Sequence, residues 1–124
     1  MKYIEAKGLK LVLKKKWYNM IASGEKKEEY RDLTEYWFKR IMATGPFIPS
    51  YQAYCYQMYR RKKGPYSETY KGKNDIVTFY LGYAKDRPSM SFKIDSIVLG
   101  NVGLPEWGAP EKGEYFIIKL GERL

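Results

Sequence analysis

GEKKEEYR, residues 24–31, places three basic and three acidic side chains in eight positions that begin with a glycine. Charges at this density usually belong to a solvated helix face, on which Glu and Lys pair four residues apart. The spacing here is more typical of a strand, because Glu29 and Arg31 then project to the same side of a sheet. We therefore interpret the stretch as a turn and a strand that carry Lys26, Glu29 and Arg31 to one end of a sheet.

The residues before this stretch predict a strand followed by a helix. Three leucines alternate with other residues over 9–13, which is the pattern of a short strand. Trp17, Met20 and Ile21 then follow helical spacing. Gly24 stands where the C-cap of this helix is expected.

The residues after the stretch predict a second amphipathic helix. Asp32 and Glu35 have the spacing of a capping box, with Asp32 as the cap. An apolar stripe follows at helical spacing, and Gly45-Pro46 ends it. The stripe consists of Trp37, Phe38, Ile41 and Met42. We expect both helices to pack on one sheet.

The second half of the chain changes to the pattern of strands. Val77, Phe79 and Leu81 alternate with other residues over 76–81, and Met90, Phe92 and Ile94 alternate with polar residues over 90–95. A further, largely apolar run at 115–120 is expected to be the last strand. The second of these runs is expected to bend near Ser96, before a further apolar run at 97–99. One strand, two helices and then several short antiparallel strands predict an α+β fold. The expected architecture is a small, mostly antiparallel, partly closed β-barrel with two or three flanking helices.

The composition limits the chemistry that the chain can perform. With 124 residues it is expected to form one domain over 1–124. It has no His and a single cysteine, Cys55, which excludes an internal disulfide, a cysteine-built zinc site and the usual general base. We therefore expect no metal and no cofactor. Any catalysis would depend on Lys, Glu, Asp, Tyr, Ser, Thr or Arg.

The charge of the chain indicates the kind of partner. A net charge of +9 and a pI near 9.5 favour a polyanion, with nucleic acid ahead of a membrane surface. Aromatic residues make up 17%, including thirteen Tyr, which is more than a small core requires. No apolar run is long enough for a signal peptide or a membrane span, so a cytoplasmic location is expected.

The pattern Gly24-x-Lys26-x-x-Glu29-x-Arg31 resembles the GxKxxExR signature of the ASCH domains, a branch of the PUA-like superfamily. The order of the predicted elements is also similar, and the resemblance covers most of the chain apart from 45–73. It implies a PUA-like β-barrel with a cleft beside the first helix, floored in part by the signature. Family members are thought to bind RNA or nucleotides in that cleft.

The same resemblance bears on catalysis. Some relatives hydrolyse an acetyl amide on modified cytidine, and others cut RNA. The amidohydrolase subset looks like GxKxxTxR, in which the signature Lys activates a Thr nucleophile. This chain keeps the lysine as Lys26 but has Glu29 where that Thr would be, which argues against amidohydrolase activity of that type.

The signature supplies two cations and an anion, for which two interpretations exist. Glu29 can hold Lys26 and Arg31 in place and leave some of their N–H groups for a phosphate or a base edge. Alternatively, Glu29 and Arg31 form a pair that closes the barrel end, with Lys26 solvated. Trp107 lies on a Pro/Gly-flanked loop and is either a lid that stacks on a base or a hydrophobic plug. The candidate ligand-binding residues are Lys26, Glu29, Arg31, Trp107, Tyr80 and Tyr83.

Residues 45–73 are interpreted as an insertion, in which Pro49-Ser50 would start a third helix. The segment has six Tyr and six Lys or Arg against one acid, Glu68, and hence a net charge of +5. Aromatic and basic residues in alternation suit single-stranded nucleic acid, because rings stack on bases while cations follow the backbone. The alternative is that part of the tyrosines form a stripe packed against the domain. The predicted contacts to the nucleic-acid backbone are Arg60, Arg61, Lys62, Lys63, Lys71 and Lys73.

Three functions follow from these observations. The leading hypothesis is a binding module for RNA or a modified nucleotide, with no catalytic residue. The second is a small hydrolase acting on a nucleoside amide or an RNA phosphodiester, with Lys26 as proton shuttle and Glu29 or Tyr30 assisting. The third is a protein-interaction module that docks through the Tyr-rich helix of the insertion.

Overall fold

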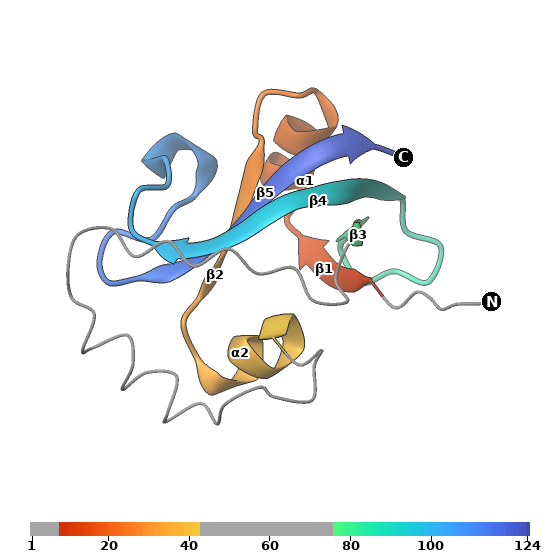
Figure 1. Ribbon diagram of the computed structural model, residues 1–124. Coiled ribbons are helices and arrows are strands. Elements are labelled where there is room, and N and C mark those ends of the chain that lie inside the picture. Colours follow the sequence, from red (N-terminus) through yellow and green to blue (C-terminus); the bar gives the residue numbers. More distant parts are fainter. Residues whose placement is uncertain (1–7, 43–75) are drawn as a thin grey trace.

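The computed structural model describes residues 8–42 and 76–124 (Figure 1). The predicted insertion at 45–73, its third helix and the six cations assigned to it lie outside the described residues. The elements in chain order are β1 (Leu9–Leu13), α1 (Lys15–Ala22), β2 (Glu28–Asp32), α2 (Glu35–Met42), β3 (Ile76–Leu81), β4 (Ser89–Gly100), the 3₁₀ helix η1 (Pro105–Trp107) and β5 (Tyr115–Arg123).

The five strands form one curled sheet in the order β1-β3-β4-β5-β2. Strand β1 pairs with β3 in parallel, and the other three pairings are antiparallel. The long strands β4 and β5 lie side by side through the middle of Figure 1 and curve together. Within residues 8–42 and 76–124, the expected α+β fold with a mostly antiparallel, barrel-like sheet is thus confirmed as a half-barrel with two α-helices. Strands β1 and β2 are its two edges.

The pairing of β4 with β5 has a local irregularity where the buried face of β4 changes. Buried side chains alternate from Met90 to Ile94 and then change phase, so that Ile97 and Leu99 are buried instead. The register with β5 shifts in the same place, on both sides of Ile94. The bend predicted near Ser96 falls at this irregularity, within one continuous strand.

Helix α1 ends as its sequence indicates. Gly24 follows the C-cap Ser23 with a φ of 87°, a conformation that favours glycine. Its amide donates to the Ile21 carbonyl at 3.1 Å. The chain turns back at once, which places Lys26 beneath the helix. On the buried side of α1, Tyr18 accompanies Ile21, whereas the predicted stripe contained Met20, which is only partly buried.

The start of α2 differs from the prediction. Asp32 is the last residue of β2, paired with Tyr115, so it is not the helix cap. Thr34 has that role, because its hydroxyl accepts the Trp37 amide at 3.2 Å and its carbonyl accepts the Phe38 amide at 2.8 Å. The capping-box spacing placed the cap two residues too early because the strand continues through Asp32.

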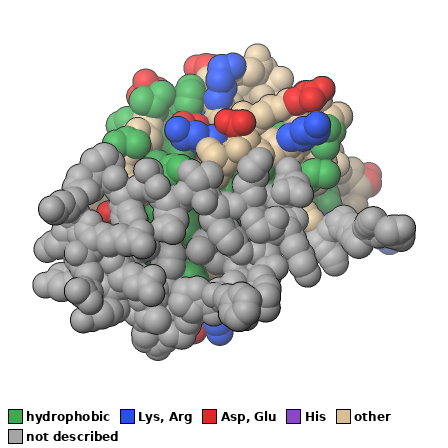
Figure 2. Space-filling view, viewed as in Figure 1, with side chains coloured by type: hydrophobic (Ala, Val, Ile, Leu, Met, Phe, Trp, Pro, Cys, Tyr) green, Lys and Arg blue, Asp and Glu red, His purple; other side chains and the backbone are tan. Residues whose placement is uncertain are grey.

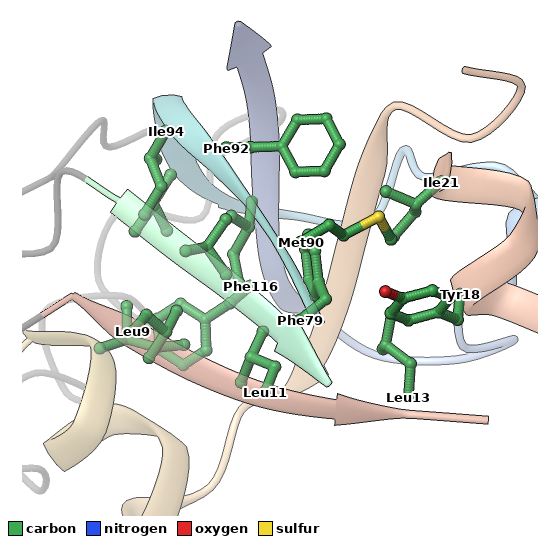
Figure 3. Packing of buried hydrophobic residues seen from close by; sticks show 14 of the residues in the cluster. Leu9, Leu11, Leu13, Tyr18, Ile21, Phe79, Met90, Phe92, Ile94 and Phe116 are labelled. Atoms are coloured by element: carbon green, nitrogen blue, oxygen red, sulfur yellow. The ribbon is translucent and has the colours of Figure 1, made fainter. Parts of the chain in front are cut away.

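The hydrophobic core lies on the concave side of the half-barrel and receives both helices. Figure 3 shows Met90 of β4 reaching toward Ile21 and Tyr18 of α1. Helix α2 adds Phe38 and Ile41 to the same cluster. Along β5, Phe116 and Ile118 belong to this core, whereas the alternate residues pack in a second cluster on the other face. The second cluster contains Tyr30, Tyr115 and Ile117, with Val98, Trp107 and Ala109 at its margin. The loop that carries η1 therefore packs against β2 and β5, next to the sheet edge.

Candidate functional site

A pocket of about 500 Å³ lies where the two edge strands of the half-barrel face each other. The guanidinium of Arg31 on β2 reaches across the opening and donates to the Val12 carbonyl of β1 at 3.4 Å. The described residues that line this space, which we call the seam pocket, are Lys10, Val12, Leu13, Lys14, Trp17, Glu29, Tyr30, Arg31, Tyr36, Trp37, Arg40, Tyr83, Trp107 and Gly108. It is thus assembled from both sheet edges, both helices and two loops.

The lining of the seam pocket is aromatic and cationic. Its aromatic residues are Trp17, Tyr30, Tyr36, Trp37, Tyr83 and Trp107, and its cations are Lys10, Lys14, Arg31 and Arg40. Among the described lining residues Glu29 is the one acid, and it is already paired with cations. The pocket therefore presents flat apolar rings together with an excess of positive charge. On the coloured part of the face in Figure 2, by comparison, Lys and Arg side chains lie beside Asp and Glu.

Lys26, Glu29 and Arg31 form one buried ionic network. The carboxylate of Glu29 lies between the two cations: Oε1 is 3.2 Å from Lys26 Nζ, and Oε2 accepts from Arg31 Nη1. Lys26 is 2% and Glu29 5% exposed. Arg31 also donates to the Tyr30 carbonyl at 3.0 Å, and its guanidinium lies 5.0 Å from the centre of the Trp37 ring. A carboxylate buried at this depth is stable only because both of its oxygens are paired.

The ammonium of Lys26 is enclosed on all sides. It donates to the Trp107 carbonyl as well as to Glu29. Its nitrogen lies 5.1 Å from the centre of the Trp17 ring and 4.8 Å from that of Tyr30, within the range of cation–π attraction. Burial lowers the pKa of Lys26 below its ordinary value, and the Glu29 carboxylate opposes that shift. Lys26 is therefore buried behind the pocket, and not solvated as one of the two interpretations had it.

Two tyrosine hydroxyls hold the loop before η1. Tyr30 donates to Glu28 Oε1 at 2.8 Å and accepts the Leu104 amide at 3.1 Å. Tyr115 accepts the Gly103 amide at 2.9 Å, and the two rings pack edge to face. Burial raises the pKa of the Tyr30 hydroxyl, so it stays a neutral hydrogen-bond donor. These contacts fix the backbone of Gly103 and Leu104, directly before η1.

The structure brings four of the six predicted ligand-binding residues to the seam pocket. Glu29, Arg31, Trp107 and Tyr83 line it, and Tyr83 is 82% exposed at its rim. Lys26 lies behind the lining. Tyr80 is not part of the lining and instead has the Arg87 guanidinium 4.2 Å from its ring centre.

Several residues of the pocket were not identified from the sequence. Trp17 and Trp37 were assigned to the apolar stripes of the helices, yet both are only partly buried and face the pocket. Lys10, Lys14 and Arg40 were not singled out from the sequence, and they also line the pocket.

Within residues 8–42 and 76–124 no group of His, Cys, Asp and Glu side chains is arranged to hold a metal ion. None of the helices in this part of the chain is long and apolar enough to cross a membrane.

Comparisons with protein-family models, with curated proteins and with solved structures return no match. The likeness to the ASCH signature and to a PUA-like barrel therefore remains a prediction made from the motif and the order of elements.

Proposed function

We propose that this protein binds RNA or a modified nucleotide, and that the ligand occupies the seam pocket. The observation that carries the proposal is the lining: the described part of it has six aromatic residues and four cations around one neutralised carboxylate. This combination matches the two chemical parts of a nucleotide. The ASCH-like signature supports the same assignment, because two of its residues, Glu29 and Arg31, belong to the lining.

The aromatic residues suit a planar base. Stacking of a base on an aromatic ring contributes about 1–3 kcal/mol and works for every base, because each has a π-face. Trp17, Trp37 and Trp107 offer large rings from three different elements. The volume of about 500 Å³ lies within the range of about 300–1,000 Å³ that is usual for small-ligand sites.

The cations suit the phosphate. Lys10 and Lys14 are exposed at the pocket on β1 and just after it, and Arg40 is exposed on α2. Lysine gives a point contact and arginine a forked one, and both bind phosphate oxygens. Glu29 does not cancel this attraction, because its charge is matched by Lys26 and Arg31.

The geometry favours binding over hydrolysis. A hydrolase would need the Lys26 amine to reach the reacting group, but the side chain of Lys26 is 1% exposed and already donates to Glu29 and Trp107. Incubation with N4-acetylcytidine and with single-stranded RNA checks this alternative. Turnover that Lys26→Ala abolishes would make the hydrolase the better assignment.

The binding proposal is tested by titrating a labelled single-stranded RNA of about 12 nucleotides at several salt concentrations. Lys14→Ala should weaken binding and reduce the log–log salt slope by about 0.7, the value for one phosphate that is no longer neutralised. The matched control is Lys93→Ala, which removes the same charge from β4, outside the pocket lining. It should leave the slope almost unchanged. Equal effects in both variants would mean that RNA follows the overall charge and not the seam pocket.

A further inference from the structure

We propose that Lys26 is a positioning residue: its ammonium holds the Trp107 carbonyl and thereby fixes one wall of the seam pocket, without contacting the ligand. The inference rests on the proposed function for the identity of the ligand. We call this role a latch: Lys26 holds the loop that carries Trp107 and does not contact the ligand itself.

Lys26 has no donor left for a ligand. An ammonium has three N–H groups. Glu29 and the Trp107 carbonyl accept two of them, and the remaining direction faces the rings of Trp17 and Tyr30. The side chain is 1% exposed and absent from the pocket lining. A nucleotide in the pocket therefore contacts the aromatic rings of the lining and not the Lys26 ammonium.

The loop wall of the pocket packs on the second apolar cluster, and the Lys26 hydrogen bond gives it a directed polar contact. The entrance of the loop is tied to Tyr30 and Tyr115 through the amides of Gly103 and Leu104. Beyond that point η1 is a single turn, held internally by the Trp107 and Gly108 amides at 2.9 Å each. In the described part of the chain, the hydrogen bond from Lys26 is the one that joins residues 105–108 to the sheet side of the pocket. These are the residues that bring Trp107 and Gly108 to the lining.

The ionic network also joins two opposite walls. Lys26 holds the backbone of Trp107, and Arg31 stacks on the ring of Trp37 in α2. Glu29 bridges the two cations. The spacing between the loop wall and the helix wall is thus set by a continuous ionic chain, and a rigid spacing is what a slot for a planar ring requires.

The latch can be tested without any ligand. With fluorine-labelled tryptophan, the protein gives one ¹⁹F signal for each of its three tryptophans, and Trp107→Phe identifies the signal of Trp107. Lys26→Met, which keeps the length and removes the charge, should move the Trp107 signal toward its position in the unfolded chain. The matched control Lys14→Met should leave it in place. An unmoved Trp107 signal in Lys26→Met overturns the proposal.

RNA titration of the same two variants separates a latch from a contact. Lys26→Met should weaken binding by about 10-fold or more, as expected when a stacking wall is displaced, with an unchanged salt slope. Lys14→Met should reduce the slope by about 0.7. A reduced slope in Lys26→Met shows a phosphate contact and contradicts the latch. If the unaltered protein binds no RNA, the proposed function fails while the ¹⁹F result still decides the role of Lys26.

A measurement on the unaltered protein covers the case in which Lys26→Met does not fold. An ammonium enclosed by Glu29 and Trp107 exchanges slowly with water, so ¹⁵N-labelled lysine should give a visible Lys26 ammonium signal. That signal should stay in place when RNA saturates the protein. Its absence at neutral pH, or a large shift on binding, overturns the proposal.

Discussion

The buried hydroxyl of Tyr30 should make the stability of the folded protein depend on pH. It donates to Glu28 and accepts from the backbone amide of Leu104, so it joins β2 to the loop of the seam pocket. Burial is the main cause that raises its pKa above the ordinary value of 10.0. The folded state thus favours the protonated phenol more strongly than the unfolded state does.

The sign of the pH effect follows from that difference. The pKa of the Tyr30 hydroxyl is higher in the folded than in the unfolded state. Its contribution to the free energy of unfolding is therefore fully present below pH 10.0 and is lost as the pH rises toward the pKa of the folded state. Tyr30→Phe cannot ionise. It should cost about 0.5–1.5 kcal/mol at neutral pH, because the hydrogen bonds of the hydroxyl are removed. Above pH 10.0 the difference between the two proteins should shrink.

Denaturant unfolding of both proteins from pH 7 to pH 11 measures this difference. Tyr36→Phe is the control, because Tyr36 is 57% exposed. A constant gap between Tyr30→Phe and the unaltered protein across that range would contradict the expected role of the hydroxyl.

Among the elements, the η1 loop contains a glycine that both its backbone conformation and its packing require. Gly108 has a φ of 95°, and a Cβ there would come within 3.0 Å of the Trp17 ring. Gly113 on the next loop has a similar φ of 79°, but a Cβ there would meet nothing within 4 Å. A comparison of substitutions at Gly108 and Gly113 therefore separates the cost of backbone strain from the cost of contact with Trp17.

Both alanine substitutions should destabilise the protein, for different reasons. Gly113→Ala should cost about 1–2 kcal/mol, the penalty of a left-handed conformation for a residue with a side chain. Gly108→Ala should cost more and should also weaken RNA binding, because Trp17 must move. Thermal melting and RNA titration measure the two effects. Equal melting temperatures for both variants would show that Trp17 moves without cost.

The elements themselves could largely be predicted from periodicity. The alternation at 76–81 and the change of phase near Ser96 both reflect burial on one face of a sheet, which is local information. The cap of α2 was misplaced because Asp32 and Thr34 are both good caps, and only the pairing of Asp32 with Tyr115 decides between them. That pairing joins residues far apart in the chain and leaves no local signal.

For the molecule as a whole, the candidate site was harder to predict than the fold. The signature predicted that Glu29 and Arg31 share one face, and they do. The seam pocket also needs β1 and β2 to meet, although they are opposite edges of the sheet. That meeting depends on how strongly five strands curl, which no short motif encodes. Trp17 and Trp37 were therefore assigned to the apolar stripes of the helices, and Lys26 was predicted to contact the ligand directly.

The overall charge gives a further prediction, which concerns the insertion. If residues 45–73 bind phosphates in addition to those at the pocket, neutralising Arg60, Arg61, Lys62 and Lys63 together should flatten the salt slope of RNA binding. The expected change is about 0.7 for each phosphate that the cluster neutralises. Titration at several salt concentrations measures it, with circular dichroism as the control for folding. An unchanged slope would remove this cluster from the binding surface.

The order in which the strands pair has a consequence for synthesis of the chain. Strands β1 and β2 lie within the first 32 residues, but their partners β3 and β5 begin only at Ile76 and Tyr115. On the ribosome, both edges of the half-barrel thus emerge well before the strands that complete them. Strands β3, β4 and β5 follow one another and can pair locally, whereas the edges must close long loops, which is slow. The seam pocket can form only after β5 has left the ribosome, so a nascent chain cannot bind a ligand there before that strand has emerged.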